Sequence, residues 1–350
     1  MASLEFFNVG IEAVSACVPK NVRSNNELIK LLGEKELNKI VKNIGIKEMR
    51  HVTSGVTPSD LCYEAALELL NNELIDKSEI DLVLFLSQNG DFKIPATSPS
   101  LQHRLGLSTS TGCIDLNLAC SGYVYALSTA YAYANLKTVN KVLLLVGETF
   151  SKDISELDKV NAPLYGDAGT ATLISKGDYG KSEFNLYSDG SGFDAINIKA
   201  GGARHPANAE SIKLREMENG NFRTLHQIYM DGVDVFNFTL KVVPSSIKEA
   251  LIKSNNSIED IDVFLFHQAN KFMIDFFRKK LKIPEEKVPI SLDEFGNVSS
   301  ATIPLTIVTR LNGKLNTRNR LLLSGFGAGL SWATAIINTS NIKISKLREI

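Results

Sequence analysis

Short apolar runs alternate along the chain with longer stretches of mixed or small residues. KVLLLVGE (141–148) and RLLLSGFG (320–327) have the composition and length of buried strands. SGYVYALSTAYAYANL (121–136) has the length and spacing of a mostly buried helix, and residues 233–254 predict one long helix that Pro244 kinks or divides. This alternation of strands and helices predicts an α/β fold.

The second half of the chain repeats the pattern of the first. ELLNNELIDKSEIDLVLFLSQN (68–89) matches EALIKSNNSIEDIDVFLFHQAN (249–270) without a gap, and LLLVG (143–147) matches LLLSG (321–325). A period near half the chain length indicates duplication rather than a solenoid. We therefore expect two equivalent halves, 1–178 and 179–350, packed as one pseudo-symmetric body.

The repeat places polar residues with possible chemistry at related positions. Cys120 and Asn297 each follow a predicted strand and precede a predicted helix, and His267 stands where Leu86 stands in the first half. Open α/β sheets bind ligands at the carboxyl ends of their strands. The halves are thus expected to share a skeleton and to differ in their reactive groups.

Composition and charge exclude several classes of protein. The chain of 350 residues is 44% hydrophobic and 22% charged, and its 38 Lys and Arg balance 39 Asp and Glu, so nothing indicates a nucleic-acid binder. The first residues, MASLEFFNVGIEAV, predict a strand rather than a signal peptide, and no apolar stretch could span a bilayer. We expect a cytoplasmic protein with four free thiols and no membrane association.

Cys120 lies where a strand, expected to end near Ala119, turns into a helix that begins near Ser121. A helix N-terminus offers unpaired N–H groups and a partial positive charge, and both favour the reactive thiolate. A cysteine that merely packs in a tight turn fits this segment equally well, and we assign that role to Cys17, Cys62 and Cys113.

His267 and Asn297 are each weak signals when taken alone. A histidine at the end of the strand in FLFHQAN (264–270) is often a hydrogen-bonded structural residue, and an asparagine beside Gly296 is often only a turn residue. Together with Cys120 they form a set of Cys, His and Asn at strand ends of a duplicated fold. That combination favours a covalent catalyst.

The motifs around Cys120, His267 and Asn297 follow one another along the chain in an order that resembles the thiolase superfamily, specifically the 3-oxoacyl-[acyl-carrier-protein] synthase III family. The resemblance runs nearly end to end and implies a thiolase-like fold, with duplicated βαβαβαββ halves in a layered α/β/α/β/α arrangement. It rests on ACSGYVYAL around Cys120, YGDAGTA (165–171), FHQAN around His267, GNVSSATIP around Asn297 and SGFGAGLSWA (324–333).

The resemblance implies a two-stage acyltransferase reaction. Cys120 takes an acyl group from a thioester, and malonyl-acyl-carrier protein then loses carbon dioxide and attacks the Cys120 thioester to give a 3-oxoacyl product. His267 Nε2 and the Asn297 amide would stabilise the enolate oxygen, and the backbone N–H of Cys120 and one in the Gly327–Ala328 turn would stabilise the acyl intermediate. No cofactor or metal is expected.

The resemblance also implies binding residues. Asn270 would hold the phosphopantetheine arm, Tyr165 would lie near the acyl tunnel, and Ile94 would shape the acyl pocket across the interface of a homodimer. The basic run Arg278, Lys279 and Lys280 would either dock the acidic carrier protein or be only a solvated helix face.

The family's usual clamp for the coenzyme A head is not found in residues 31–51, which contain no Trp and carry Lys42 or Asn43 near the place of an Arg. The donor is therefore acyl-CoA or another acyl thioester. We expect Gly166, Asp167 and Gly169 of YGDAGTA to be structural.

Two further expectations concern single features outside the motifs. Trp332 is expected in the core, and the polar segment 201–227 is expected as a surface excursion near the entrance.

Other second steps remain open. The acyl group on Cys120 could pass to a different acceptor in a secondary pathway or undergo another thioester condensation, including a 3-hydroxy-3-methylglutaryl-type reaction, for which the loop 87–92 offers only Asp91 as a base. A cysteine hydrolase would instead need His267 as a general base toward water. A non-enzymatic carrier-binding subunit is disfavoured because all three residues of the set are present.

Overall fold

The computed structural model describes residues 2–70, 75–217 and 220–350. Ten strands form one large sheet with the order β12-β13-β14-β7-β6-β4-β5, to which β1, β15 and β16 add through β1. The principal strands are β1 Ala2–Val18, β4 Ile80–Leu86, β5 Gly112–Leu116, β6 Lys141–Thr149, β7 Asp167–Ser188, β12 Val263–Phe266, β13 Arg318–Gly327 and β14 Ser331–Ser340.

Short strands and the helices complete the fold. The short strands are β2 Val22–Ser24, β3 Glu48–Arg50, β8 Ile196–Asn197, β9 Arg215–Glu216, β10 Phe222–Arg223, β11 Tyr229–Met230, β15 Lys343–Ile344 and β16 Arg348–Glu349. The helices are α1 Ile29–Leu32, α2 Glu34–Ile44, α3 Pro58–Leu70, α4 Ser98–Arg104, α5 Gly122–Ala134, α6 Gly232–Lys253, α7 Lys271–Leu281, α8 Leu292–Phe295 and α9 Thr302–Arg310.

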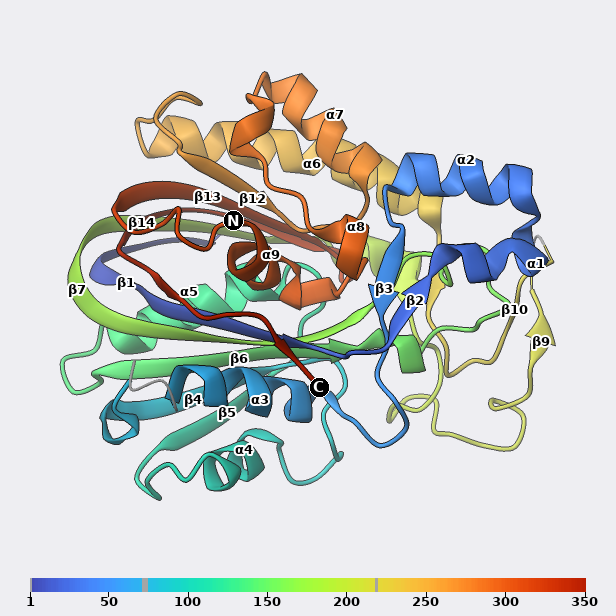
Figure 1. Cartoon of the computed structure of the whole chain (residues 1–350), viewed down its shortest axis with the longest axis horizontal. Helices are drawn as coiled ribbons and strands as arrows, with labels where there is room; N and C mark the ends of the chain where they lie inside the picture. Colours follow the sequence, from blue (N-terminus) through green and yellow to red (C-terminus); the bar gives the residue numbers. More distant parts are fainter. Residues whose placement is uncertain (1, 71–74, 218–219) are drawn as a thin grey trace.

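The elements stack in five layers (Figure 1). Helices α6 and α7 cover the outer face of β12, β13 and β14, α3 and α4 cover the opposite outer face, and α5 and α9 lie in the middle. Three apolar clusters fill the spaces, and the largest surrounds α5 and α9 between the two parts of the sheet. This is the layered α/β arrangement that the resemblance predicts.

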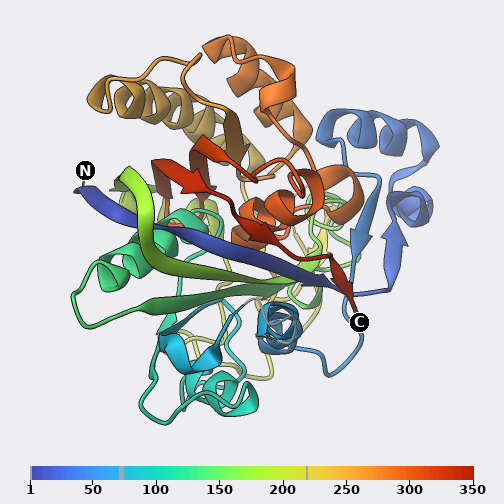
Figure 2. The ribbon, with the colours of Figure 1, turned by 60° about the vertical axis from the view of Figure 1, so that its left-hand side comes forward.

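Strands β1 and β7 join the two parts of the sheet. β1 crosses the molecule from the N-terminus with β7 and β6 alongside (Figure 2), and it pairs antiparallel with β7 from Ala2 opposite Leu186 to Cys17 opposite Gly169. The expected N-terminal strand is therefore present. The expected boundary between residues 178 and 179 falls inside the continuous strand β7, and the division into halves stays a prediction.

The repeated segments occupy related positions. β4 pairs parallel with β6, and β12 pairs parallel with β13, so each half brings two strand ends side by side. The predicted strands at 141–148 and 320–327 correspond to β6 and β13, and the helix predicted at 121–136 corresponds to α5. α6 is one helix of 22 residues with Pro244 inside it, so the proline does not divide it.

One element boundary differs from the expectation. β5 ends at Leu116, and a short irregular segment leads to Cys120, whereas the sequence places the strand end near Ala119. The cysteine therefore lies on a loop between strand and helix. Ser121 is the N-cap of α5, and no side chain caps the helix.

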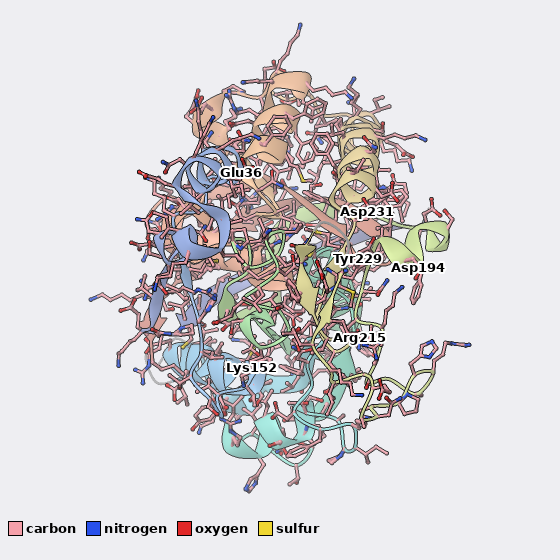
Figure 3. All side chains as sticks on the ribbon, turned by 90° about the vertical axis from the view of Figure 1, so that its right-hand side faces the viewer. Glu36, Lys152, Asp194, Arg215, Tyr229 and Asp231 are labelled. Atoms are coloured by element: carbon pink, nitrogen blue, oxygen red, sulfur yellow. The ribbon has the colours of Figure 1, made fainter. Side chains whose placement is uncertain are left out.

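The segment 201–227 forms a largely exposed excursion (Figure 3, where Arg215 marks β9). Strands β8 and β11 pair at its base. Residues 221–223, around β10, contact the loop before β7. Arg223 forms an ion pair with the buried Asp158, and Asn221 accepts a hydrogen bond from the Lys159 N–H. In the described residues, no helix is both long and apolar enough to cross a membrane.

Candidate active site

Cys120, His267 and Asn297 line one cavity of about 270 Å³, although they are far apart in sequence. Cys120 precedes α5, His267 follows β12, and Asn297 lies between α8 and α9. The structure thus brings together the three residues expected to act on substrate. The rest of the wall is mainly apolar: Leu164, Tyr165, Ile196, Met230, Gly232, Val233, Val235, Phe236, Thr239, Ala269, Asn270, Met273, Phe326 and Gly327.

The backbone of β13 lies very close to Cys120. A Cβ atom at Gly327 would lie 2.7 Å from Cys120 Cβ and 3.1 Å from its sulfur, and one at Gly325 would lie 2.9 Å from Ser121 Cα. Any side chain at these positions would displace the nucleophile. The glycines of β13 therefore allow its backbone to approach the cysteine, as the predicted backbone role of Gly327 requires.

Burial disfavours the thiolate form of Cys120. Burial raises the pKa of Cys120 to about 11, against a smaller lowering by the hydrogen bond with Ser299. The sequence led us to expect that the helix N-terminus would favour thiolate. The direction of the pKa shift contradicts that expectation, because burial is the largest of its causes.

Ser299 is the side chain that contacts the nucleophile. Its Oγ lies 3.5 Å from Cys120 Sγ, and the residue is fully buried. Ser299 also has a left-handed backbone with φ of 48°, which non-glycine residues adopt at a cost of about 1–2 kcal/mol. This conformation directs a hydroxyl toward the sulfur.

His267 is buried and held on several sides. Its backbone N–H donates to the Ser324 carbonyl at 2.8 Å, its Nδ1 lies 2.8 Å from Thr302 Oγ1, and the Phe326 ring packs edge-on with centroids 5.2 Å apart. Burial lowers the pKa of His267 to about 3, so the imidazole is neutral at ordinary pH. A neutral imidazole can serve as a proton acceptor.

Asn297 is fixed through its backbone. Its N–H donates to the Leu164 carbonyl at 2.8 Å, and its carbonyl accepts from the Gly166 N–H at 3.1 Å, which makes a bridge between Asn297 and Tyr165. Its side-chain Oδ1 accepts from the Ser299 N–H at 2.8 Å. Because the amide oxygen is used in this way, the NH₂ group is the part of the side chain left to donate to a substrate.

The expected binding residues divide into two groups. Tyr165, Asn270 and Gly327 line the cavity, and Asn270 also caps α7 by accepting from the Met273 N–H at 2.9 Å. Ile94 does not line it and is 87% exposed. Ala328 follows Gly327 but is also outside the lining, so its predicted oxyanion role rests on position in the chain alone.

The three basic residues at the end of α7 differ in whether they already contact another side chain. Arg278 pairs with Glu285 at 3.1 Å, and the Lys280 ammonium lies over the Phe276 ring, whereas Lys279 is exposed. Only part of the expected docking patch is therefore available to an acidic partner. At the other end of α7, near the cavity, Phe272 is half exposed.

The YGDAGTA segment is built for close packing, as expected. A Cβ at Gly166 would lie 2.2 Å from the Phe295 carbonyl oxygen, and one at Gly169 would lie 2.3 Å from the backbone of Leu61. Asp167 is buried and accepts hydrogen bonds from the backbone N–H groups of Val52 and Ser151.

Trp332 lies outside the cavity lining and stacks on Tyr187, with centroids 5.1 Å apart. Trp332 also packs against the apolar cluster between α6, α7 and the strands β12 and β13, which is consistent with a packing role.

Three residues around the site were not predicted from the sequence. Ser299 and Thr302 stand inside the GNVSSATIP motif, where attention to hydroxyls near Asn297 would have found them. Glu148 ends the apolar run of β6, is fully buried, and accepts from Ser300 Oγ at 3.2 Å and from the Gln88 N–H at 3.3 Å. An acid inside an apolar run was the available signal.

No cluster of three or more acidic, His or Cys side chains suited to a metal occurs within the residues that the structure describes. All four cysteines are free.

Comparison with known proteins agrees with the geometry. Residues 114–190 match the family described as 3-Oxoacyl-[acyl-carrier-protein (ACP)] synthase III, and residues 251–339 match its C-terminal counterpart. A beta-ketoacyl-[acyl-carrier-protein] synthase III of Desulfitobacterium hafniense is 35% identical over 95% of this chain and 98% of that protein.

Solved structures give the same result. A 3-oxoacyl-(acyl-carrier protein) synthase of Burkholderia xenovorans LB400 superposes with a TM-score of 0.92 at 33% identity, over 100% of this chain and 99% of the other. A second 3-oxoacyl-(acyl-carrier-protein) synthase III has a TM-score of 0.90 at 38% identity, over 95% and 100%. The chain therefore belongs to the 3-oxoacyl-[acyl-carrier-protein] synthase III family, the condensing acyltransferases of fatty-acid biosynthesis.

Proposed function

We propose that this protein condenses an acyl group held on Cys120 with malonyl-acyl-carrier protein, with release of carbon dioxide and a 3-oxoacyl product. The observation that carries the proposal is the shared cavity of Cys120, His267 and Asn297. A covalent cysteine divides one difficult acyl transfer into two easier steps.

The first step is the transfer of an acyl group to Cys120. Because burial favours the protonated thiol, the sulfur needs a proton acceptor, and His267, whose imidazole is neutral, lines the same cavity. The backbone N–H of Cys120, with a second donor from the Gly327–Ala328 turn, would stabilise the tetrahedral oxyanion.

The second step builds negative charge on the malonyl thioester oxygen as carbon dioxide leaves. The Asn297 amide, held by its oxygen, would donate to that oxygen, and His267 Nε2 would donate to it whenever that nitrogen carries a hydrogen. Loss of one oxyanion donor typically costs about 3 kcal/mol. The apolar walls around them exclude water, which strengthens these hydrogen bonds and protects the acyl enzyme.

The substrates are an acyl thioester, as acyl-CoA or another donor, and malonyl-acyl-carrier protein. Asn270, at the start of α7, lies where a phosphopantetheine arm would enter, and Tyr165 lines the cavity that would hold the acyl chain. Lys279 and Lys280 give the neighbouring helix end a positive charge suited to an acidic carrier.

We further propose a cytoplasmic homodimer. Ile94 and Phe92 are large apolar side chains exposed by 87% and 71% on one loop, and burial against a second copy would remove both from water. Ile94 would then shape the partner's acyl pocket. Four free cysteines suit a reducing compartment.

Intact-protein mass spectrometry tests the proposal. The protein is incubated with acyl-CoA and with acyl-carrier-protein donors, beside the variant Cys120→Ala and the control Cys113→Ser. We expect one acyl mass on the protein and the control and none on Cys120→Ala. Malonyl-acyl-carrier protein should then remove that mass and yield carbon dioxide and a 3-oxoacyl product.

Two results would contradict the proposal. Absence of any acyl adduct on the unmodified protein would remove the role of Cys120. Release of free acid in place of a 3-oxoacyl product would indicate a cysteine hydrolase instead.

A further inference from the structure

The Thr302 side chain lies between the catalytic histidine and a backbone carbonyl. Its Oγ1 is 2.8 Å from His267 Nδ1 and also 2.8 Å from the Ser299 carbonyl oxygen. All three residues are buried, with exposures of 1% for His267 and Thr302 and 0% for Ser299. The Thr302 hydroxyl therefore lies between His267 and the Ser299 carbonyl, and a hydrogen bond with the Ser299 backbone also acts against the lowering of the His267 pKa.

A hydroxyl has only one hydrogen to donate, so these two distances decide which nitrogen of the neutral His267 ring carries the hydrogen. The Ser299 carbonyl can only accept, and it must receive the Thr302 hydrogen for two oxygens to lie 2.8 Å apart. Thr302 Oγ1 then accepts at its other side, and the hydrogen between it and His267 belongs to Nδ1. The other ring nitrogen, Nε2, is left with a lone pair.

The opposite arrangement is unfavourable. If Thr302 donated to Nδ1, its oxygen and the Ser299 carbonyl oxygen would face each other at 2.8 Å with no hydrogen between them. Two buried acceptors in contact repel each other, and burial increases the penalty. The geometry therefore selects the tautomer with a hydrogen on Nδ1.

We propose that Thr302 is a positioning residue that fixes this tautomer and so makes His267 Nε2 the acceptor of the Cys120 proton. The series from His267 through Thr302 to the Ser299 carbonyl has the same orienting role as the third member of a catalytic triad, but it contains no carboxylate. The inference rests on the proposed acylation of Cys120.

The proton balance of both steps follows from this arrangement. In acyl transfer, the Cys120 sulfur bonds to the donor carbonyl carbon, the donor's carbon–sulfur bond breaks, and the thiol proton passes to Nε2. The leaving thiolate takes that proton from Nε2, so the donor leaves as a thiol and the imidazole is neutral again. In condensation, the malonyl carbon that loses carbon dioxide bonds to the acyl carbon, the Cys120 carbon–sulfur bond breaks, and the sulfur takes a proton from solvent by way of Nε2.

This sequence also explains how one nitrogen serves both steps. Nε2 accepts the thiol proton in the first step and passes a solvent proton to the sulfur in the second. The Nδ1 hydrogen stays on Nδ1 and is donated to Thr302 Oγ1 throughout, so the ring does not need to turn over between the steps. Phe326, packed against the ring edge, holds the same orientation.

The test combines nitrogen NMR of the ligand-free protein with the rate of acylation. Spectra of ¹⁵N-histidine-labelled protein, with His267→Gln for assignment, should show His267 with a protonated Nδ1 and an unprotonated Nε2. Thr302→Val removes the hydroxyl at nearly constant volume, Thr302→Ser restores it, and Thr306→Val is the matched control. Thr306 is a buried threonine one turn further along α9, with its hydroxyl on the Thr302 carbonyl.

We expect Thr302→Val to lose the Nδ1-protonated signal and to acylate Cys120 at least about tenfold more slowly, since a misoriented general base removes much of its contribution. Thr302→Ser and Thr306→Val should keep both the signal and a rate close to that of the unmodified protein. A His267 protonated on Nε2 in the unmodified protein would overturn the inference, as would fast acylation by Thr302→Val.

The outcomes separate this inference from the proposed function. The tautomer is measured without substrate, so it stands or falls independently of acylation. Should Thr302→Val fail to fold, the spectra of the unmodified protein and of Thr302→Ser still decide. An Nδ1-protonated His267 in a protein that no donor acylates would overturn the proposed function alone.

Discussion

The two halves expected from the sequence repeat, 1–178 and 179–350, carry the same pair of parallel strands with different residues at the strand ends. In the first half, β4 ends in apolar Leu86 and the neighbouring β6 carries the buried acid Glu148. In the second half, His267 follows β12 and the neighbouring β13 carries Phe326. Polar and apolar residues have thus exchanged strands between the halves.

This difference separates the residues that line the cavity from those that only support it. His267 and Phe326 face the cavity, whereas Glu148 lies behind it and bonds to Ser300 and to the loop after β4. We expect the first half to provide the nucleophile Cys120 and a buried polar anchor, and the second half to provide the groups that handle protons and developing charge. A duplicated fold can therefore specialise by changing few residues at strand ends.

The strongest way to sharpen this comparison is to remove a charge-handling group from the second half. Asn297→Ala should slow decarboxylation about 100- to 1,000-fold, because one oxyanion donor is lost, while acylation of Cys120 continues. Mass spectrometry reports acylation and carbon dioxide release reports decarboxylation. An equal loss of both steps would contradict the role given to Asn297.

A change in the first half should act on stability instead. Burial raises the pKa of Glu148 from 4.5 to about 8. Between these values the unfolded chain releases the proton that the folded protein keeps, so the stability of the native protein falls as the pH rises and is lowest above about pH 8. Glu148→Gln cannot ionise and should escape this loss.

Urea unfolding at about pH 5 and about pH 9 measures the effect. The stability of Glu148→Gln relative to the unmodified protein should rise by roughly a few kcal/mol between the two conditions, at about 1.4 kcal/mol per pKa unit. The exposed Glu286→Gln serves as the control and should show little change. A constant difference for Glu148→Gln would mean that the carboxyl is already ionised in the folded state.

The contact between the halves can be tested at Ser299. Ser299→Gly keeps the left-handed backbone, which glycine adopts freely, and removes the hydroxyl beside Cys120. Alkylation of Cys120 by iodoacetamide should slow about tenfold, because the thiolate loses a hydrogen-bond donor. Ser300→Ala, at the adjacent buried residue, should alkylate normally, and an unchanged rate in Ser299→Gly would show that the contact is only packing.

The smallest effect on activity is expected at the basic end of α7, away from the strand ends of both halves. The double variant Lys279→Glu, Lys280→Glu should raise the KM for malonyl-acyl-carrier protein by about threefold to tenfold without changing kcat, and added salt should reduce the difference. Lys314→Glu, an exposed change beyond the far end of α9, is the control. An unchanged KM would leave the run as a solvated helix face.

Much of the fold was predictable because its signals are local. The apolar runs that became β6 and β13, the small-residue helix α5 and the repeat around β4 and β12 follow from patterns within short segments. The set of Cys120, His267 and Asn297 was predictable because motifs surround each residue and the repeat relates their positions.

The remaining properties depend on packing between distant segments. Nothing near Cys120 in sequence indicates that burial in the folded protein raises the pKa of its thiol. Arg278 could not be seen to pair with Glu285, and the contact of Ser299 with a cysteine 179 residues away requires the folded chain. Charge states and partners are tertiary properties, whereas element type is largely local.

The bridge between Asn297 and Tyr165 has a consequence for the accuracy of the reaction. In the proposed reaction an acyl group on Cys120 has two fates, capture by the malonyl-derived carbon or loss to water, and Asn297 would speed only the first. Because the Asn297 backbone is held on both sides by residues 164–166, substitutions in that segment would loosen the amide without touching Cys120. We expect such variants still to load acyl groups but to lose a larger share of them to water, so that the yield per acyl group falls together with the speed.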